Sequence, residues 1–399
     1  MSAAAADAPL IFLIAGEASG DVIGAHLMAA LKRQVGGAVR FAGVGGDRMA
    51  GEGLASLFPI DELAVMGLAE VVPHIPRLLR RIREVADAAL AARPAAVVSI
   101  DSPDFAFRVQ CRLKRIGAPR LHIVAPQVWA YRPARAAELP RFLDHLLVLL
   151  PFEPPFFERY GLACTFIGHP SLEEGVGAVD GAAFRARHGI PADAPVLVIL
   201  PGSRRSVVRR TLAVFLETAA RLQRKRPGLS LVLPCVRHLK AEVEAAVERR
   251  GLAVTVVEGR EEKLGAFAAG TAALTVSGTV SAELAVAGLP MVVGYRMNPL
   301  TAAIARRIVK VPYITLVNLI LKRQIVPEFV LDACRPERLA PALEEVMVDG
   351  PARHAQIEGF KEAVAALRAG EMAPSERAAA VILEIMARRR AERATAKGQ

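Results

Sequence analysis

Cysteine is scarce in this sequence, and the few that occur lie far apart. The 399 residues contain four cysteines, at positions 111, 164, 235 and 334, and no two of them form a CxxC pair. This spacing excludes a disulfide-stapled scaffold and a cysteine zinc site, and it is typical of a protein kept in a reducing cytoplasm. The eight histidines form neither an HExxH nor an HxxxH pattern, so the sequence predicts no protein-bound metal.

Long hydrophobic runs are also absent. The opening stretch MSAAAADAPLIFLIAGE has no basic region before its short apolar run, and Glu17 and Asp21 follow at once, which argues against a signal peptide or a membrane span there. Further along, the apolar stretch FLDHLLVLLPFEPPFF is interrupted by Asp144 and His145. We therefore expect a soluble or membrane-surface protein.

Aromatic residues make up only 5% of the chain. Their scarcity argues against nucleic acid as a partner despite the net charge of +11, because such sites interleave aromatic and basic side chains. Residues 1–175 hold 18 basic and 18 acidic side chains, so the whole excess lies in residues 176–399. Residues 74–141 nevertheless carry 13 basic and 5 acidic side chains, a local surplus that suits phosphates or an anionic lipid surface.

The sequence is rich in alternating apolar runs and helix-like segments. Hydrophobic residues make up 53%, enough for sizeable cores, and the length is typical of two domains. The apolar runs are LIFLIAG, VRFAGVGG, AAVVSID, RLHIVAP and HLLVLLP in the first half, and APVLVILPGSR, LSLVLP, LAVTVVEG, AALTVSG and LPMVVGY in the second. Apolar strands between helices predict covered parallel sheets. We expect an α/β protein with two doubly wound, Rossmann-like domains facing across a cleft.

The stretch IGHPSLEEGVGAVDG, residues 167–181, is rich in glycine and interpreted as the hinge between these domains. It predicts an N-terminal domain over residues 1–172 and a second domain over residues 173–365. Helices in residues 366–399 either return to the first domain, cross to another subunit or hang free. Ligands of open sheets bind at the carboxyl ends of strands, so the polar residues after each strand are the functional candidates.

The first strand end is AGEASGDVIG, in which glycine recurs every four residues from position 16. This spacing is neither GxGxxG nor a Walker loop, which argues against NAD and ATP. Gly16 and Gly20 allow a ligand to approach the backbone, and Glu17 and Ser19 are placed to bond its hydroxyls. The alternative is a plain strand-to-helix turn in which Asp21 stabilises the helix start.

VVSIDSPDF, residues 97–105, ends a second strand with Asp101. We expect Pro103 to hold Ser102 in an extended conformation and to begin a helix that Asp104 caps. Asp101 is then left at the strand end, where a carboxylate can act as a general base whose pKa depends on burial and nearby arginines. The alternative is that Asp101 only ties the loop down.

The next strand end, APQVWAYRPAR, presents Gln127, Trp129, Tyr131 and Arg132. These groups suit a stacking and hydrogen-bonding wall for a sugar. The alternative is that the indole of Trp129 packs against the edge of the domain.

LPGSRR, residues 200–205, follows the first strand of the second half. Gly202 and Ser203 offer backbone N–H groups, and the guanidinium of Arg204 fits phosphate oxygens, so the segment predicts a diphosphate site. The alternative is that the arginines from Arg204 to Arg210 form a solvated helix face.

TVSGTVSAELAVAGLPMVVGY, residues 275–295, is the most specific segment. Its strand ends at Ser277, and Gly278 and Thr279 allow close approach to a helix start with unpaired N–H groups. Glu283 does not complete a capping box, so we expect its carboxylate to be free to accept bonds from the two hydroxyls of a ribose. The alternative is an ordinary polar residue on a helix.

Together these motifs resemble those of the lipid-A-disaccharide synthase family, glycosyltransferase family 19, in the same order and at the expected separations. The motifs are AGEASGD, DSPDF, PQVWAYR, LLPFE, IGHP, LPGSR, VSGT with Glu283, and MVVGYRMNPL followed by VNLIL, and they span residues 10–335. The resemblance implies a membrane-associated, inverting glycosyltransferase of GT-B fold. It implies that UDP-2,3-diacylglucosamine and 2,3-diacylglucosamine 1-phosphate are joined into the β-1′,6 lipid A disaccharide with release of UDP.

The resemblance also assigns roles to residues. Asp101 would take the proton of the acceptor's 6-hydroxyl, and the helix start at residues 277–279 would hold the diphosphate together with Arg204. Glu283 would bind the ribose.

The same resemblance implies further contacts around these groups. Glu17 and Ser19 would face the acceptor or donor sugar, in company with the groups Gln127 and Trp129 of the sugar wall. Arg296 and Asn318 would be additional nucleotide or phosphate contacts. We expect no cofactor and no metal, because an arginine and a helix N-terminus can offset the charge that develops on the diphosphate.

VMGLAEVVPHIPRLLRRIREV, residues 65–85, mixes apolar and basic side chains in a pattern suited to a helix lying on a bilayer. The apolar members are Val71, Ile75, Leu78, Leu79 and Ile82, and the basic ones are Arg77, Arg80, Arg81 and Arg83. An ordinary amphipathic helix packed on the sheet is the alternative. The acylated substrates implied by the resemblance favour peripheral contact with the inner face of the cytoplasmic membrane, as a monomer or homodimer.

The sequence departs from the family pattern in two places. Val207 lies where relatives commonly carry an acid after LPGSR, and KRQIVPEF follows VNLIL where relatives often have a glycine, which makes the roles of Gln324 and Glu328 uncertain. Two other functions compete: another UDP-sugar enzyme such as a 2-epimerase, and a peripheral protein that binds anionic lipid. The DSPDF and AGEASGD motifs argue against the epimerase.

Overall fold

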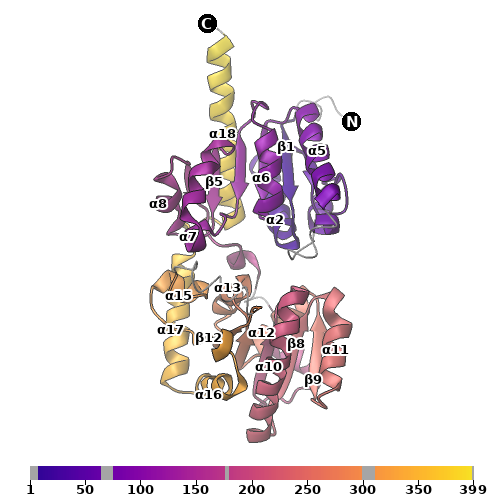
Figure 1. Cartoon of the computed structure of the whole chain (residues 1–399), viewed down its shortest axis with the longest axis vertical. Coiled ribbons are helices and arrows are strands. Elements are labelled where there is room, and N and C mark those ends of the chain that lie inside the picture. The colour runs from indigo at the N-terminus through magenta and orange to yellow at the C-terminus, as the bar shows by residue number, and fades with distance from the viewer. Residues whose placement is uncertain (1–7, 64–74, 176–178, 299–310, 398–399) are drawn as a thin grey trace. The chain divides into compact units, whose positions relative to one another are not determined.

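The computed structural model describes residues 8–63, 75–175, 179–298 and 311–397. The chain forms two compact units (Figure 1). Unit 1 consists of Met1–Pro170 and Leu367–Gln399, and unit 2 of Ser171–Ala366. The expected α/β class with two doubly wound parallel sheets is confirmed.

Unit 1 is built on a six-stranded parallel sheet in the order β2-β1-β3-β4-β5-β6. Its strands are β1 (Leu10–Ala15), β2 (Arg40–Val44), β3 (Ala96–Ile100), β4 (Arg120–Ile123), β5 (His145–Val148) and β6 (Cys164–Phe166). The five apolar runs of the first half form β1 to β5. The edge strand β6 was not predicted, because its three partly exposed residues leave too short a pattern.

Helices cover both faces of this sheet (Figure 1). The helices of unit 1 are α2 (Ala18–Gln34), α3 (Asp47–Gly51), η1 (Ile60–Leu63), α5 (Ile75–Ala92), α6 (Pro103–Arg112), α7 (Val128–Tyr131), η3 (Pro133–Arg141), α8 (Glu153–Glu158) and α18 (Pro374–Lys397). Along β1, Ile11 and Leu13 pack toward α2 and α18, whereas Phe12 and Ile14 pack toward α5 and α6. This alternation follows from the two-residue period of a strand.

The last helix, α18, belongs to unit 1 although it follows unit 2 in the chain. Ala378, Ala379, Ile382 and Ile385 are buried in the same apolar cluster as α2 and β1. The guanidinium of Arg377 also donates from Nε to the carbonyl oxygen of Phe166 at 2.9 Å. The core of unit 1 is therefore completed by the C-terminal segment.

Unit 2 has a second six-stranded parallel sheet in the order β12-β11-β10-β7-β8-β9. Its strands are β7 (Val196–Leu200), β8 (Ser230–Cys235), β9 (Val254–Glu258), β10 (Ala272–Thr275), β11 (Met291–Tyr295) and β12 (Glu328–Val330). The apolar runs predicted β7 to β11. The three-residue edge strand β12 was missed for the same reason as β6.

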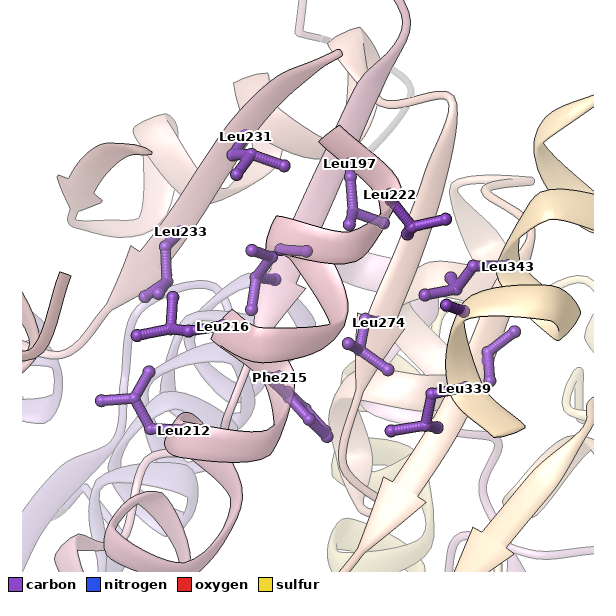
Figure 2. Close-up of a cluster of buried hydrophobic side chains, with 14 of the residues drawn as sticks. Leu197, Leu212, Phe215, Leu216, Leu222, Leu231, Leu233, Leu274, Leu339 and Leu343 are labelled. Atoms are coloured by element: carbon purple, nitrogen blue, oxygen red, sulfur yellow. The ribbon is translucent and has the colours of Figure 1, made fainter. Parts of the chain in front are cut away.

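The helices of unit 2 divide between two buried clusters. They are η4 (Pro170–Glu173, which begins at the last residue of unit 1), α9 (Gly181–Arg187), α10 (Arg205–Lys225), η6 (Arg237–Leu239), α11 (Lys240–Glu248), α12 (Arg260–Ala269), α13 (Thr279–Val286), α15 (Leu316–Leu321), η7 (Leu331–Ala333), α16 (Pro336–Met347) and α17 (Pro351–Ala366). Figure 2 shows one cluster, in which Phe215 of α10 and Leu339 of α16 pack over Leu274 of β10. On the opposite face, α12 and α13 share the other cluster through Phe267 and Leu284.

In each sheet there is a point from which successive strands are added toward opposite edges. In unit 1 the reversal lies between β1 and β3, and in unit 2 it lies between β7 and β10. Ligands of open α/β sheets bind outside the carboxyl ends of the strands at such a point. Ser19 lies in the first turn of the helix after β1, and the turns after β3, β7 and β10 contain Asp101, Arg204 and Ser277.

Candidate active site

Asp101 follows β3 in a strained turn. Asp101 has φ of 54° and Ser102 has φ of 44°, both in the left-handed region that side chains disfavour. The N–H of Asp101 donates to the carbonyl oxygen of Ile123 at 3.0 Å. Its Oδ1 accepts from the backbone N–H of Ser102 at 2.8 Å. Strained conformations of this kind cost about 1–3 kcal/mol each and cluster at functional sites.

The expectation of an extended Ser102 was wrong. The helix α6 does begin at Pro103, but Ser102 occupies its N-cap position in a left-handed conformation, and Asp104 lies in the first turn instead of capping it. The chain has only Asp101 and Ser102 in which to turn from strand to helix. Two successive left-handed residues make that turn, and they override the preference set by the proline.

The turn after β1 packs directly on Asp101 and Ser102. The hydroxyl of Ser19 donates to Asp101 Oδ2 at 2.6 Å. A Cβ at Gly16 would lie 2.4 Å from Ser102 Cβ, and one at Gly20 would lie 3.0 Å from the carbonyl oxygen of Ile100. These glycines therefore allow two strand ends to meet, and a phosphate is not needed to explain them.

Asp21 and Glu17 flank this turn. Asp21 lies in the first turn of α2, but its carboxylate caps the next helix instead: Oδ1 accepts from the N–H groups of Gly46 and Met49 at 2.7 and 3.0 Å. Glu17 is the extended N-cap residue of α2, and it is half-buried beside the exposed Ser19. The carboxylate of Asp21 is thus structural, whereas that of Glu17 lies at the edge of the sheet where the strands end.

A buried polar cluster lies beneath Asp101. The hydroxyl of Ser99 lies 2.8 Å from His122 Nδ1, and the amide nitrogen of Gln110 donates to that hydroxyl at 3.0 Å. Burial lowers the pKa of His122 to about 4, although the charge of Asp101 opposes the shift. At neutral pH this imidazole is uncharged, and its side chain is fully buried, whereas Asp101 is partly exposed at the strand end. Asp101 is therefore the better placed candidate for proton removal.

Trp129 packs inside unit 1 with its polar atom engaged. The indole lies edge-on to Phe152 with ring centroids 5.0 Å apart, and Nε1 donates to Glu153 Oε1 at 3.1 Å. Gln127 is exposed at the start of α7, and Tyr131 is 40% exposed. The structure thus contains the edge packing of Trp129 named as the alternative, and it leaves the amide of Gln127 accessible.

Glu153 is a buried carboxyl that the sequence reasoning passed over. It is 3% exposed, and its Oε2 accepts from the backbone N–H of Leu150 at 3.0 Å. Burial raises the pKa of Glu153 to about 7. Its only signal in the sequence was a place in the LLPFE motif next to an apolar run.

In unit 2, the turn between β7 and α10 presents the predicted diphosphate residues. Gly202 has φ of 112°, and a Cβ there would lie 3.1 Å from Val207 Cγ1. Ser203 and Arg204 are exposed, and Arg204 is the extended N-cap residue of the 21-residue helix α10. Val207, one of the departures from the family pattern, is partly buried against the core.

Among the arginines beyond this turn, Arg209 and Arg210 are exposed on α10, as in the alternative of a solvated helix face. Arg209 donates from Nε to Glu242 at 2.9 Å on the exposed face of α10. Arg204 instead lies at the helix start, where the positive end of the helix dipole favours an anion.

The turn between β10 and α13 is the second glycine turn at this edge. Gly278 is the N-cap residue with φ of 150°, and the exposed Thr279 begins the helix. Ser277 is partly buried, and its hydroxyl donates to the carbonyl oxygen of Ile314 at 2.5 Å. The hydroxyl of Ser277 therefore fastens the turn to the segment before α15.

Glu283 is not free, which corrects the expectation from the sequence. Its Oε2 accepts from Lys263 Nζ of α12 at 2.7 Å. The two side chains are 13% and 28% exposed. This partner was not predicted from the sequence, because the two residues lie on different helices.

Asn318 also differs from its predicted role. Its side chain is fully buried: Nδ2 donates to Val326 O at 2.8 Å and to Glu328 Oε1 at 2.7 Å, and Oδ1 accepts from the N–H groups of Ile325 and Val326 at 2.8 and 2.9 Å. All four hydrogen-bonding positions of the amide are thus occupied. Asn318 positions a loop, and it does not present its amide to a ligand.

Glu328 holds the start of α15 with both carboxylate oxygens. Its Oε2 accepts from the N–H of Ile314 at 2.9 Å, and its Oε1 accepts from the N–H of Thr315 at 2.9 Å. The exposed Arg296 follows β11 at the same edge of the sheet, and Gln324 is exposed. Glu328 was named in the sequence without a role, and the structure gives it one.

The predicted membrane helix corresponds to α5, but its residues separate into two groups. Ile82 is buried in the core, and Leu78 packs against it, as in the ordinary amphipathic alternative. Ile75 and Leu79 are 42% and 40% exposed. The neighbouring basic side chains Arg77, Arg80 and Arg83 are also exposed.

Arg81, which was predicted to contact the membrane, instead binds residues of its own unit. Its guanidinium donates to both carboxylate oxygens of Glu62, at 2.8 and 3.0 Å, and lies 4.4 Å from the ring centroid of Phe58. These contacts fix η1 to α5. Val71 lies outside the described residues.

Two searches of the described residues gave negative results. Within residues 8–63, 75–175, 179–298 and 311–397, no group of three or more His, Cys, Asp or Glu is arranged to hold a metal ion. No helix in that part of the chain is both long and apolar enough to cross a membrane.

Comparison with known proteins gives a consistent result. A family model described as lipid-A-disaccharide synthetase matches residues 11–382. A lipid-A-disaccharide synthase of Rhodospirillum centenum is 50% identical over 382 residues, which is 95% of each chain. One from Paramagnetospirillum magneticum is 46% identical, over 94% of this chain and 97% of its own length.

Solved structures extend the comparison to the fold. The S. aureus protein MnaA with UDP has a TM-score of 0.61 at 12% identity, covering 88% of this chain and 90% of its own. A calicheamicin glycosyltransferase has a TM-score of 0.59 at 15% identity, covering 96% and 99%. At these identities the likeness shows a shared fold and nothing about activity or substrates.

Proposed function

Since this chain belongs to the lipid-A-disaccharide synthase family, we propose that it joins UDP-2,3-diacylglucosamine to 2,3-diacylglucosamine 1-phosphate. The products are the β-1′,6 lipid A disaccharide 1-phosphate and UDP, formed with inversion at the anomeric carbon. The observation that carries the proposal is the arrangement at the two strand-order reversals. A strained carboxylate turn occupies one, and two glycine turns at helix starts flank the other.

In this proposal Asp101 is the general base on the acceptor side. Its carboxylate takes the proton from the acceptor's 6-hydroxyl as that oxygen forms a bond to the anomeric carbon. The bond from the same carbon to the diphosphate oxygen breaks on the opposite face, and UDP leaves with the electron pair. The bonds from Ser19 and from the Ser102 N–H fix the carboxylate before substrate binds, which reduces the reorganisation needed for reaction.

Unit 2 supplies the site for the leaving group. The exposed guanidinium of Arg204 and the N–H groups around Gly202 and Ser203 bind the diphosphate, with Gly278 and Thr279 at the start of α13. In this proposal these donors offset the charge that develops on UDP, and a metal ion is not required.

Four further residues complete the nucleotide side. Glu283 accepts bonds from the ribose, and Arg296 is an additional phosphate contact. Ser277 supports the turn through Ile314. Asn318 contributes indirectly, by holding the loop that ends at Glu328.

The sugars and lipid chains are assigned to unit 1. Glu17, Ser19, Gln127 and the face of Trp129 contact the acceptor or donor sugar. The exposed side chains of α5, among them Leu79, Arg77 and Arg80, meet an anionic membrane surface, where each arginine contributes about 1 kcal/mol of attraction.

The direct test is a UDP-release assay with purified protein and both acylated glucosamine substrates, followed by mass spectrometry of the lipid product. We expect UDP and disaccharide in equal amounts, and no loss of rate in EDTA. Isomerisation of the UDP-sugar without a lipid acceptor would support the epimerase instead. Vesicle binding without turnover would support a lipid-binding protein.

A further inference from the structure

We propose that Lys263 is the positioning residue that makes the nucleotide site selective for ribose, by holding the carboxylate of Glu283. The inference rests on the proposed function, since it concerns how the UDP site recognises its ligand. Its starting point is the 2.7 Å ion pair between Lys263 Nζ and Glu283 Oε2.

The pair lies one turn inside two neighbouring helices. Gly259, with φ of 96°, turns the chain from β9 into α12, and the N–H of Lys263 donates to its carbonyl oxygen at 3.1 Å. Glu283 is the fifth residue of α13, beyond the four N–H groups that a helix start leaves unpaired. Both helices contribute to the same buried cluster, through Phe267 of α12 and Leu284 of α13. Both side chains thus extend from the edge where the strands end.

The acid next to Lys263 in the chain has other partners, and Lys263 itself pairs with Glu283. The adjacent Glu262 accepts from Arg187 and lies 2.6 Å from His188 Nε2, both on or next to α9. The stem of Lys263 runs toward Phe267, with Nζ 5.9 Å from the centroid of that ring. The ammonium is therefore held above α12 in the direction of α13.

The pairing solves an electrostatic problem at a diphosphate site. A carboxylate that is only 13% exposed needs a partner for its charge, and an unpaired one would also repel the phosphates of UDP. Lys263 neutralises the carboxylate and fixes its plane through one oxygen. The remaining lone pairs of Glu283 then meet the ribose hydroxyls in a defined orientation.

The test compares binding of UDP and 2′-deoxy-UDP by calorimetry in the full-length protein. We expect the wild type to prefer UDP by roughly tenfold, the value of one hydrogen bond to a charged group. Lys263→Met should weaken UDP binding by about tenfold while changing 2′-deoxy-UDP much less, so that the preference falls below about threefold. Lys263→Arg should restore part of the preference.

A matched control is available in the same unit. Lys225 and Glu344 form an ion pair of the same 2.7 Å length, and Lys225 lies at the far end of α10, away from the carboxyl ends of the strands. Lys225→Met should change neither affinity nor preference. A second control is Glu283→Gln, in which adding Lys263→Met should cause little further loss.

Two outcomes would overturn the inference in different ways. If Lys263→Met retained the full preference for UDP while weakening both nucleotides equally, Lys263 would be a phosphate contact or a structural residue only. If the wild-type protein bound neither nucleotide, the proposed function would fall as well. The first failure would be seen in the Lys263→Met variant and the second in the wild-type protein, so the two can be distinguished.

Discussion

The two units turn their chains at the strand ends by opposite means. After β3 and β4 in unit 1, the left-handed residues are Asp101, Ser102 and Val124, all with side chains. After β7 and β10 in unit 2, they are Gly202 and Gly278. A glycine adopts this conformation without strain, whereas a side chain must be held there by its surroundings. Unit 1 therefore holds the carboxylate of Asp101, the proposed base, in a strained turn, and unit 2 places glycine turns at the starts of α10 and α13, where we propose that the diphosphate binds.

The largest expected effect separates the two units by function. Asp101→Ala should lower kcat by about 10³-fold and leave UDP affinity unchanged, because it removes a base and no nucleotide contact. Arg204→Ala should weaken UDP binding by roughly tenfold or more. Turnover assays and UDP titrations on the same preparations check both. Equal loss of UDP affinity in the two variants would contradict the division between the units.

A second effect concerns the buried carboxyl of unit 1. Burial raises the pKa of Glu153 from 4.5 to about 7, so the folded state keeps a proton that the unfolded chain loses. The stability of unit 1 should therefore fall as pH rises from 4.5 to 7, by up to about 3 kcal/mol. Glu153→Gln should abolish this contribution and gain stability relative to wild type as pH rises.

Urea unfolding at pH 5 and pH 8 measures the difference. The single tryptophan lies in unit 1, so its fluorescence reports on that unit. Burial lowers the pKa of His122 and His169 to about 4, which gives a slope of opposite sign, but both residues are present in each protein and cancel in the comparison. Parallel pH profiles of wild type and variant would contradict the prediction.

A third effect tests the contact between the strand ends of unit 1. Gly16→Ala would place a Cβ 2.4 Å from that of Ser102, so we expect a loss of about 1–3 kcal/mol in stability together with reduced turnover. In the background of Ser102→Gly the same change should cost less, because the Cβ and hydroxyl of Ser102 are gone. Equal losses in the two backgrounds would show that the contact is not the cause.

The smallest effects should have opposite signs in the two units. Ser102→Gly relieves a strained φ, so stability should rise or stay within about 1 kcal/mol of wild type while kcat falls. Gly278→Ala should lower stability by about 1–2 kcal/mol, since φ of 150° disfavours a side chain even though no heavy atom lies within 4 Å. Thermal unfolding of both variants measures the contrast.

The sequence predicted the architecture well because its signals are local. Ten apolar runs between helical segments predicted ten of the twelve strands, and the polar residues that follow them marked the strand ends. This rule was enough to place Asp101 and Arg204 at strand ends, and their roles remain predictions. The edge strands β6 and β12 were missed because three residues do not establish a period.

Residues whose roles depend on distant partners were harder to predict. Arg81 resembled its neighbours on a basic helix, yet Glu62 lies 19 residues earlier and engages its guanidinium. Asn318 resembled a ligand contact, and only the fold of residues 325–328 shows that its amide is fully used. The pairing of Glu283 with Lys263 spans two helices and has no periodic signature.

The return of α18 to unit 1 has a consequence for biosynthesis. Ile382 and Ile385 fill the core of the unit that is begun first, and they leave the ribosome after all of unit 2. The nascent N-terminal sheet must wait, with one face covered by α2 but not yet by α18, while the whole of unit 2 is translated. The part of the protein that starts folding first is thus the last to be finished.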